Sequence, residues 1–401
     1  MIGVAVLGST GSVGESTLDV LARNRERFRL VAIAANSNAT KLARQVLEFR
    51  PAYAALATPT AALQLKELLG SAAPGTRVLG GAEALEELAV LEEVDCVMAA
   101  IVGAAGLRST LAAARAGKRL LLANKESLVM AGPLLVAAVN RAGATLLPID
   151  SEHNAIFQCL PPGARPGVAP PGVRRVLLTA SGGPFRETPS AALESVTPQA
   201  ALAHPTWIMG RKITIDCATL MNKGLELIEA CLLFGLTPAQ VQILVHPQSI
   251  VHSLVEYADG SVLAELASPD MRTPIAHALA WPERIDSGVE FLDLLKAGRL
   301  DFRAPDPDKF RCLALAEAAA RAGGLQPVVL NAANEVAVAA FLEGRLNFPG
   351  IAAVIEAVVE RSAGGAIGDL EDVLAADAEG RARARERIGL TTSAAVRGAH
   401  A

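Results

Sequence analysis

The stretch that decides the fold is IGVAVLGSTGSVG, residues 2–14 of a 401-residue chain. Its first six residues are apolar or small and predict a buried strand, and the glycines at positions 8, 11 and 14 predict a tight turn after it. A helical pattern starts near Glu15. Strand, glycine-rich turn and helix in this order favour a dinucleotide-binding site, because the turn backbone and the helix N-terminus attract a pyrophosphate. The spacing is GxxGxxG rather than GxGxxG, so a purely structural turn is the alternative.

The same alternation of strand and helix continues to residue 149. Helical patterns separate further strand-like segments at residues 29–35, 52–57, 77–79, 94–100, 118–122 and 144–147. Such an order is typical of a doubly wound parallel sheet. We therefore predict an α/β protein whose residues 1–149 form a Rossmann-like, nucleotide-binding domain.

Polar and basic residues follow the second of these strands. Asn36, Ser37 and Asn38 stand there, with Lys41 and Arg44 beyond them. An NAD-dependent enzyme usually places Asp or Glu at this point to bind the ribose 2′-hydroxyl, whereas a basic residue accommodates the 2′-phosphate of NADP. The sequence therefore predicts NADPH as the cofactor, with a much higher kcat/KM than NADH.

Composition argues against several classes of protein. The formal net charge of −4 argues against nucleic-acid binding, and charged residues interrupt the apolar windows before they reach the roughly 20 residues of a membrane span. No secretory signal pattern opens the chain, and its five cysteines form no CxxC pair. We expect a globular, cytoplasmic protein with no nucleic-acid or membrane partner.

The motif after the strand at 118–122 is Asn124-Lys125-Glu126. It stands at the carboxyl end of a strand, where ligands bind in open α/β sheets. An ion pair that caps the following helix is an equally good explanation of these residues.

Two carboxylates, Asp150 and Glu152, follow the strand at 144–147. Carboxylates this close repel each other unless a cation lies between them, and their hard oxygen atoms suit Mg²⁺ or Mn²⁺. Helix capping by the Asp-Ser-Glu motif is the alternative, and this stretch alone favours it.

A further strand, predicted at residues 173–180, ends in Ser181-Gly182-Gly183. Small residues at a strand end expose backbone N–H groups, and the Ser181 hydroxyl adds another donor, so this turn suits an anion. A tight turn without a ligand explains the same residues.

The densest group of polar and aromatic residues is HPTWIMGRKITIDCATLMNKGLE, residues 204–226. Its first part predicts a loop that carries Trp207 and Met209 as a lid, and residues 213–215 predict a short strand. A helix should then place Asn222 and Glu226 on one face with Lys223 beside them. In that arrangement Lys223 would address a phosphate and Glu226 a metal, and a surface Lys–Glu pair is the alternative.

The rest of the chain divides into three predicted parts. We expect a catalytic α/β domain over residues 150–284, a connector over 285–309 and a helical bundle over 310–401. Four periodic segments support the bundle, at residues 310–322, 327–344, 349–362 and 369–388.

Seven motifs in this order resemble the 1-deoxy-D-xylulose 5-phosphate reductoisomerase family: GSTGSVG, LLANKESLV, PIDSEHNAIFQ, TASGGPFR, the stretch at 204–226, VHPQSIVHS and SPDMRTPIAHALAWPER. The resemblance implies an NADPH- and metal-dependent homodimer that converts 1-deoxy-D-xylulose 5-phosphate, a phosphorylated sugar, to 2-C-methyl-D-erythritol 4-phosphate. It also implies a skeletal rearrangement on the metal, followed by reduction, in the non-mevalonate isoprenoid pathway. Mn²⁺ or Mg²⁺ is the implied metal, and Co²⁺ is a further candidate.

The resemblance also assigns residues to roles. The implied metal ligands are Asp150, Glu152 and Glu226, and the implied catalytic residues are Lys125, Glu152, His204 and Lys223. The implied substrate contacts are Lys125, Ser151, Glu152, Ser181, His204, Trp207, Met209, Cys217, Asn222, Lys223 and Glu226. The cofactor contacts that we expect are Thr10, Gly11, Ser12, Val13, Asn36, Ser37, Asn38, Asn124, Glu126 and Gly210. His252 is a weaker candidate near the site.

One residue departs from the family pattern. Cys217 stands where the family typically has a serine that donates to the substrate phosphate, and a thiol is the weaker donor. Two other functions compete with this assignment: a metal-free NADP-dependent aldehyde reductase and a non-enzymatic NADPH sensor on the same fold. The three carboxylates argue against both.

Overall fold

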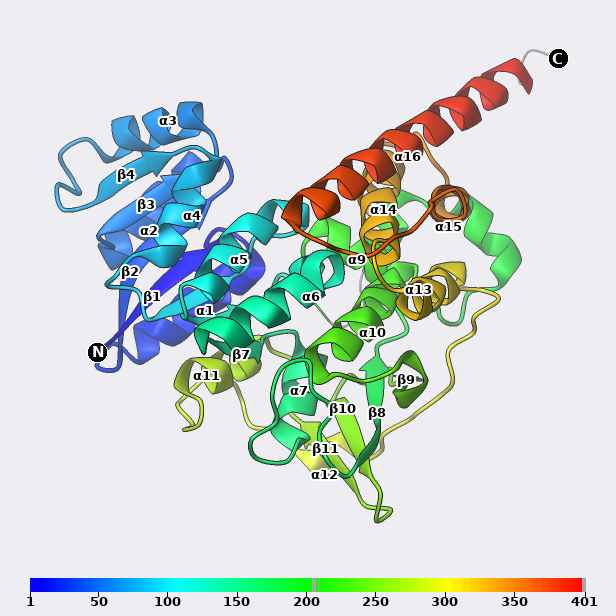
Figure 1. Cartoon of the computed structure of the whole chain (residues 1–401), viewed down its shortest axis with the longest axis horizontal. Coiled ribbons are helices and arrows are strands. Elements are labelled where there is room, and N and C mark those ends of the chain that lie inside the picture. The colour runs from blue at the N-terminus through cyan, green and yellow to red at the C-terminus, as the bar shows by residue number, and fades with distance from the viewer. Residues whose placement is uncertain (204–206, 208, 399–401) are drawn as a thin grey trace. The chain divides into compact units, whose positions relative to one another are not determined.

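A computed structural model describes residues 1–203, 207 and 209–398 of the chain, with side chains through residue 390 (Figure 1). The chain forms two compact units, and each of them uses separate stretches of sequence. The first contains Met1–Ser127, Leu135–Gln158 and Leu266–Asp293, and the second contains Leu128–Leu134, Cys159–Glu265 and Leu294–Ala401. The domain boundaries predicted at 149, 284 and 309 stay a prediction.

The first unit is built on a seven-stranded sheet in which every paired strand is parallel. The strand order is β4-β3-β2-β1-β5-β6-β7, so the chain winds outward from β1 to β4 and then returns to the other side of β1. The strands are β1 (Ile2–Leu7), β2 (Phe28–Ala35), β3 (Tyr53–Leu56), β4 (Arg77–Gly80), β5 (Cys96–Ala99), β6 (Arg119–Leu122) and β7 (Thr145–Pro148). The predicted α/β doubly wound sheet is confirmed.

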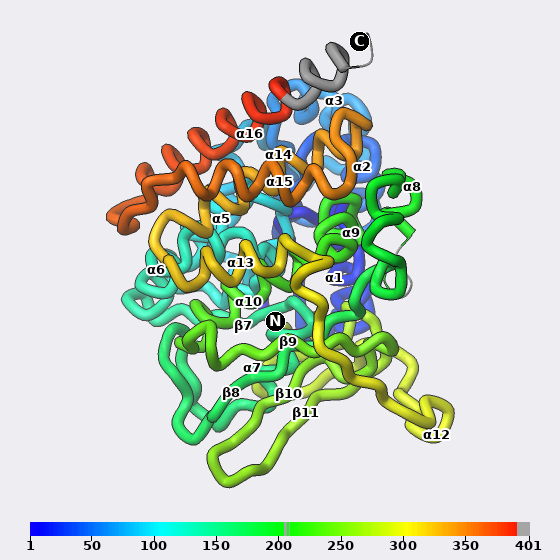
Figure 2. Tube along the Cα trace, turned by 90° about the vertical axis from the view of Figure 1, so that its right-hand side faces the viewer, coloured from blue at the N-terminus to red at the C-terminus, as the bar shows by residue number. Residues whose placement is uncertain are grey.

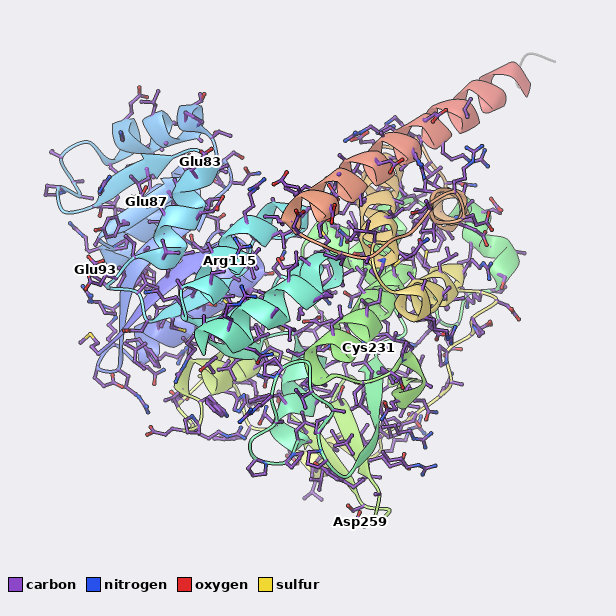
Figure 3. The ribbon with its side chains drawn as sticks, in the orientation of Figure 1. Glu83, Glu87, Glu93, Arg115, Cys231 and Asp259 are labelled. Carbon is purple, nitrogen blue, oxygen red and sulfur yellow. The ribbon has the colours of Figure 1, made fainter. Side chains whose placement is uncertain are left out.

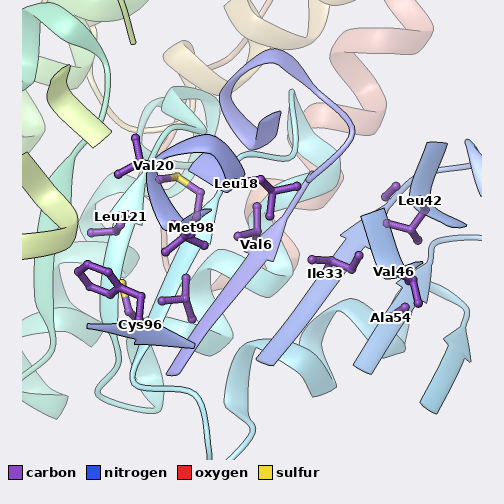
Figure 4. Packing of buried hydrophobic residues seen from close by; sticks show 14 of the residues in the cluster. Val6, Leu18, Val20, Ile33, Leu42, Val46, Ala54, Cys96, Met98 and Leu121 are labelled. Carbon is purple, nitrogen blue, oxygen red and sulfur yellow. The ribbon is translucent and has the colours of Figure 1, made fainter. Parts of the chain in front are cut away.

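The helices of this unit are α1 (Ser12–Arg23), α2 (Ala39–Phe49), α3 (Pro59–Leu69), α4 (Ala82–Val90), α5 (Leu107–Arg115), α7 (Ser151–Cys159) and α11 (Arg272–Ala280). Helix α6 (Lys125–Ala142) begins and ends in this unit, but its residues 128–134 belong to the second unit. Helices α1 to α5 and α11 contact strands of the sheet. Figure 4 shows Leu18 of α1 beside Val6 and Met98 of the central strands. Burial of each such large side chain stabilises the fold by about 1.5–3 kcal/mol.

The second unit holds a four-stranded mixed sheet in the order β11-β10-β8-β9. Its strands are β8 (Val173–Ala180), β9 (Val241–Val245), β10 (Val251–Tyr257) and β11 (Val262–Leu266), with β8 parallel to β9 and antiparallel to β10. Asp259 lies at the tip of the hairpin between β10 and β11 (Figure 3), where its carboxylate accepts the Ser261 N–H at 2.9 Å.

Helices form the remainder of the second unit. They are α8 (Pro198–Ala201), α9 (Arg211–Ala218), α10 (Met221–Phe234), α12 (Leu294–Ala297), α13 (Arg311–Ala322), α14 (Gln326–Leu342), α15 (Phe348–Val359) and α16 (Leu370–Gly398). In Figure 2 the last four lie together, and α14 packs against α13, α15 and α16. The C-terminal helical region is therefore confirmed. No helix in the described part of the chain combines the length and the apolar composition that a membrane span requires.

One predicted element is wrong. Residues 213–215, Ile-Thr-Ile, were expected to form a strand, but they lie inside α9. Their β-branched side chains favour a strand locally. Packing overrides that preference, because Ile215 is buried and the next residue, Asp216, makes its hydrogen bond to α14.

Candidate active site

The glycine-rich turn after β1 has the geometry of a dinucleotide-binding turn. Gly8 has a positive φ of 93°, and a Cβ atom there would lie 2.4 Å from the Ala100 carbonyl oxygen. A Cβ on Gly14 would lie 2.3 Å from the Gly8 carbonyl oxygen, so α1 starts in direct contact with the turn. The predicted cofactor residues Thr10, Gly11, Ser12 and Val13 lie in this turn and in the first residues of α1. This backbone fits a pyrophosphate, which the α1 N-terminus favours electrostatically.

The loop after β2 is exposed and polar. Asn36, Ser37 and Asn38 are all on the surface, and Asn38 caps α2 by accepting the Lys41 backbone N–H at 3.0 Å. Because β1 and β2 are parallel neighbours, this loop and the glycine-rich turn follow the same edge of the sheet. Two neighbouring loops at this edge are where the adenosine half of a dinucleotide binds in a doubly wound sheet.

Asn124 has a structural role that its sequence position only suggested. Its side-chain oxygen accepts the Ser127 N–H at 2.9 Å and caps α6, and its amide donates to the carbonyl oxygens of Gly103, at 3.0 Å, and of Ile101. Asn124 therefore joins the loop after β5 to the start of α6. Glu126 is buried in the first turn of the same helix.

Buried Lys125 and partly buried Asp150 form an ion pair. Lys125 follows β6 and Asp150 follows β7, and these strands are parallel neighbours, with the Ile149 N–H bonded to the Leu122 carbonyl oxygen at 2.9 Å. Their carboxyl ends therefore bring the ammonium and the carboxylate together. The side chains are only 6% and 16% exposed, so solvent screens the pair weakly.

Ser151 and Glu152 complete this group at the start of α7. The Ser151 hydroxyl donates to the Glu152 carboxylate, and both residues lie in the first turn of the helix. The helix N-terminus stabilises negative charge here. The first unit thus brings together Lys125, Asp150, Ser151 and Glu152, and the two hard carboxylates suit a divalent cation.

In the second unit the Ser181-Gly182-Gly183 turn packs against α9. Gly182 and Gly183 have φ values of 80° and 68°, and the Gly183 N–H donates to the Ser181 hydroxyl at 3.2 Å. A Cβ on Gly183 would lie 2.6 Å from the Cys217 carbonyl oxygen. Glycine is therefore required for the close approach, and the turn meets the helix residue that departs from the family pattern.

Three predicted site residues form one buried cluster on α10. The Asn222 amide donates to the Glu226 carboxylate at 2.5 Å, and Lys223 forms an ion pair with the same carboxylate. The Lys223 and Glu226 side chains are 4% and 0% exposed, so the alternative of a surface pair is wrong. Removing one partner of a buried pair leaves the other charge uncompensated, which typically costs about 3–5 kcal/mol.

Gly224 explains how α10 presents this cluster. A Cβ at Gly224 would lie 2.3 Å from the Cβ of Ala316, so α13 packs directly on this point of the helix. Residues two apart on a helix are rotated by about 200°, so Asn222 and Glu226 lie on the side of α10 opposite to α13.

The predicted lid is only partly described. His204 lies outside the described residues. Trp207 lies beside His252, with ring centroids 6.2 Å apart, and His252 Nδ1 lies 2.8 Å from the Glu265 carboxylate. Met209 is half-buried, and Gly210 is the N-cap residue of α9.

His246 is a structural residue. Its Nδ1 donates to the Asp301 carbonyl oxygen at 2.8 Å, and its Nε2 accepts the Ile250 N–H at 3.1 Å. Burial lowers the pKa of His246 below its ordinary value, which keeps this neutral tautomer.

The sequence interpretation missed Asp216. This α9 residue is 1% exposed, and its carboxylate pairs with Lys212 Nζ at 2.9 Å and accepts the Asn334 amide at 2.9 Å. A charged residue among apolar ones in KITIDCATL is a signal for a buried network. Lys212 is a local partner at i and i+4, but Asn334 lies 118 positions away on α14, so no local pattern could identify that contact.

Comparison with known proteins gives consistent matches along the chain. The model of the 1-deoxy-D-xylulose 5-phosphate reductoisomerase family matches residues 4–132, the model of its C-terminal domain matches 146–234, and a DXP reductoisomerase C-terminal domain model matches 266–383. The chain is 60% identical over 389 residues to the reductoisomerase of Methylococcus capsulatus, covering 97% of this chain and 99% of the relative. It is 59% identical over 378 residues to that of Pseudomonas aeruginosa, covering 94% and 96%.

Solved structures agree. A DOX-P reductoisomerase in complex with NADPH, fosmidomycin and magnesium superimposes with a TM-score of 0.92 at 48% identity, covering 98% of this chain and 99% of the other. The enzyme from Zymomonas mobilis in complex with NADPH gives 0.89 at 49% identity, covering 96% and 99%.

Proposed function

The chain belongs to the 1-deoxy-D-xylulose 5-phosphate reductoisomerase family, and from this premise we propose how its residues share the reaction. It is an NADP-dependent oxidoreductase that rearranges and reduces 1-deoxy-D-xylulose 5-phosphate to 2-C-methyl-D-erythritol 4-phosphate, in the non-mevalonate route to isoprenoid precursors. NADPH and a divalent metal are its cofactors.

Asp150, Glu152 and Glu226 are the proposed metal ligands. All three offer carboxylate oxygens, which are the ligands that Mg²⁺ and Mn²⁺ prefer, and Co²⁺ is a further candidate. A bound divalent ion supplies Lewis-acid polarisation of the substrate ketone and hydroxyl oxygens and orients them. Lys125 balances the charge of Asp150, and Lys223 balances that of Glu226. Two of the three proposed ligands thus have a cationic partner.

The substrate phosphate is assigned to the second unit. The Ser181 turn, Asn222 and Lys223 supply hydroxyl, amide and ammonium donors, which suit a phosphate dianion. His204 and Cys217 are the further proposed contacts. The packing of the Ser181 turn on α9 at Cys217 supports a common phosphate site for these two segments.

Lys125 and Ser151 are assigned to the reacting end of the substrate, with Glu152. A buried ammonium and a hydroxyl at the start of α7 can donate to substrate oxygens and fix their orientation. Trp207 and Met209 are the proposed cover that excludes water during reduction. Gly210 is a proposed cofactor contact beside them.

NADPH is assigned to the carboxyl edge of the seven-stranded sheet. Thr10, Gly11, Ser12 and Val13 receive the pyrophosphate, and residues 36–38 receive the adenosine ribose. Asn124 and Glu126, at the start of α6, are proposed for the nicotinamide side. The close packing of Gly8 and Gly14 in the turn supports this assignment.

One observation carries the proposal. The Lys125–Asp150 pair lies beside Glu152 at the carboxyl edge of a dinucleotide-binding sheet. An ammonium and two carboxylates at that edge are expected where a metal-bound oxygenated substrate meets a reductant. A metal-free aldehyde reductase or an NADPH sensor has no need of this group.

The direct test follows NADPH consumption spectroscopically with 1-deoxy-D-xylulose 5-phosphate. We expect NADPH oxidation that requires added Mn²⁺ or Mg²⁺ and stops in EDTA. Full turnover in EDTA would favour the metal-free reductase, and NADPH binding without turnover would favour the sensor.

We also propose that the enzyme is a homodimer. Strand β11 is an edge of its sheet, and its Val262 and Leu263 side chains are about half exposed. Leu295 in the same unit is 95% exposed. An apolar edge strand is a ready surface for pairing with a second copy. Sedimentation equilibrium should give twice the chain mass. Leu263→Glu should lower this mass, and Leu68→Glu, a control at an equally exposed leucine of α3, should not.

Cytoplasmic location is the remaining proposal. All five cysteines are free thiols, which fits a reducing compartment. Fractionation of the native host should recover the enzyme with cytoplasmic markers.

A further inference from the structure

Lys41, on the cofactor side of the first unit, reaches the glycine-rich turn from a neighbouring element. It is in the first turn of α2, and its ammonium donates to the Thr10 carbonyl oxygen at 2.9 Å. The same ammonium lies 2.8 Å from the Glu15 carboxylate of α1. The Lys41 side chain is 35% exposed, so it lies at the surface of the turn and not beneath it.

A second residue of α2 fixes this position. Gln45, one turn later and on the same face of the helix, accepts from the Ser9 hydroxyl at 2.7 Å and donates to the Ser9 carbonyl oxygen at 2.9 Å. Gln45 is buried, and its two bonds hold α2 against the turn. Lys41 is therefore presented at the point where the loop after β2 meets the loop after β1.

That point is where the adenosine ribose of a dinucleotide lies in a doubly wound sheet. The loop itself, Asn36-Ser37-Asn38, supplies neither a carboxylate for a 2′-hydroxyl nor a cation for a 2′-phosphate. The N-terminus of the 11-residue helix α2 adds a favourable field for an anion. A cation that reads the 2′-phosphate must therefore come from beyond the loop.

We propose that Lys41 is the residue that makes the enzyme select NADPH over NADH, by binding the 2′-phosphate. An ammonium has three N–H donors, and the Thr10 carbonyl and Glu15 account for two in the described structure. The bond to Thr10 anchors the ammonium, and the 2′-phosphate takes the third donor and competes with Glu15. This inference rests on the placement of NADPH proposed above.

Glu15 sets the strength of this selection. The Glu15 carboxylate is 52% exposed and pairs with the Lys41 ammonium. It therefore repels the incoming 2′-phosphate, and the two anions share the ammonium. Glu15→Gln keeps the shape of the side chain and removes its charge. It should strengthen binding of the 2′-phosphate while Lys41 stays in place.

The test is calorimetric titration of the intact enzyme with 2′,5′-ADP and with 5′-AMP, which differ only in the 2′-phosphate. Wild-type enzyme should bind 2′,5′-ADP more tightly. Lys41→Met should weaken 2′,5′-ADP binding about 10- to 100-fold, as expected for loss of one charged hydrogen bond, and leave 5′-AMP binding unchanged. Lys66→Met, at an exposed lysine in the last turn of α3, is the matched control and should change neither.

The outcomes separate this inference from the proposed function. Equal binding of the two nucleotides by wild-type enzyme would contradict both the proposed NADPH placement and the role of Lys41. If wild-type enzyme discriminates and Lys41→Met discriminates equally well, the role of Lys41 alone is overturned. Glu15→Gln is a second test, in a variant that retains Lys41. A larger preference for 2′,5′-ADP over 5′-AMP than in the wild type supports the inference, and a smaller preference contradicts it.

Discussion

Cys217 lies at the contact between α9 and the Ser181 turn, inside the proposed phosphate site. Its carbonyl oxygen meets Gly183, so its backbone position is fixed by packing whatever its side chain is. Cysteine in place of serine at this position therefore changes the hydrogen-bond donor to the phosphate, but not the packing of α9 on the Ser181 turn. A thiol is a longer and weaker donor than a hydroxyl.

Cys217→Ser should restore a stronger donor to the phosphate. We expect an unchanged kcat and a KM for 1-deoxy-D-xylulose 5-phosphate that falls about 2- to 10-fold, the value of one modest hydrogen bond. Steady-state kinetics measures both constants. Loss of turnover in this variant would show that the site assignment is wrong.

His277 is a buried histidine whose charge the fold disfavours. Burial, helped by the charge of Arg284, lowers the pKa of His277 from its ordinary 6.5 to about 4. The ring packs beside Phe157, with centroids 6.1 Å apart. Well above pH 6.5 the imidazole is neutral in both the folded and unfolded states. As the pH falls from 6.5 toward 4, the unfolded state gains a proton first, so stability is lost in this window.

Replacement of His277 should remove that loss. Between pH 7 and pH 5 the histidine should lower the free energy of unfolding by about 2 kcal/mol, and His277→Asn should lack this component. Urea unfolding at the two pH values measures the change in the free energy of unfolding for each protein. Groups that titrate in both proteins contribute equally, so they cancel when the two changes are subtracted. If the free energy of unfolding changed equally with pH in wild type and variant, this account of His277 would be refuted.

At the scale of elements, α9 shows where sequence patterns succeed and fail. The helix after it was predicted, because the Asn222–Glu226 spacing is a local signal, whereas most of the predicted loop before it lies outside the described residues. Residues 213–215 of the helix were predicted as a short strand, because all three are β-branched. In the structure Ile215 is buried and Asp216 accepts from Asn334 on α14, and a local pattern does not contain these tertiary contacts.

Asn334→Ala should therefore affect the substrate site from a distance. Buried Asp216 would lose the Asn334 amide and keep Lys212, at a cost of about 1–3 kcal/mol, and α9 with Cys217 would shift. We expect a higher KM for the sugar phosphate and an unchanged NADPH dissociation constant. Stopped-flow binding and steady-state kinetics measure these separately.

The matched control is Asn331→Ala. Asn331 is equally buried on α14, but its amide donates at 3.1 Å to Glu335 of the same helix. This variant should lose stability and keep its KM. An equal change of KM in both variants would mean that the effect is general loosening of α14, not the contact with α9.

At the scale of the whole molecule, the first unit was the more predictable. Each of its strands has a local apolar signal, and the parallel order follows from the βα alternation, so the ends of β6 and β7 could be expected to lie together. The Lys125–Asp150 ion pair is a direct consequence of that topology. In the second unit, the burial of Lys223 and Glu226 could not be predicted, because a Lys–Glu pair at i and i+3 is equally common on a solvent-exposed helix face.

The central claim is that a metal held by Asp150, Glu152 and Glu226 is required for turnover. Its most direct test is the kcat of Glu226→Gln at saturating NADPH and Mn²⁺, with the NADPH dissociation constant measured alongside. Glutamine keeps the bond to Asn222 and removes one metal-binding charge. The account predicts that kcat falls at least about 100-fold, since Lewis-acid stabilisation supplies several kcal/mol, while NADPH binding is unchanged. A kcat near that of the wild type would contradict it.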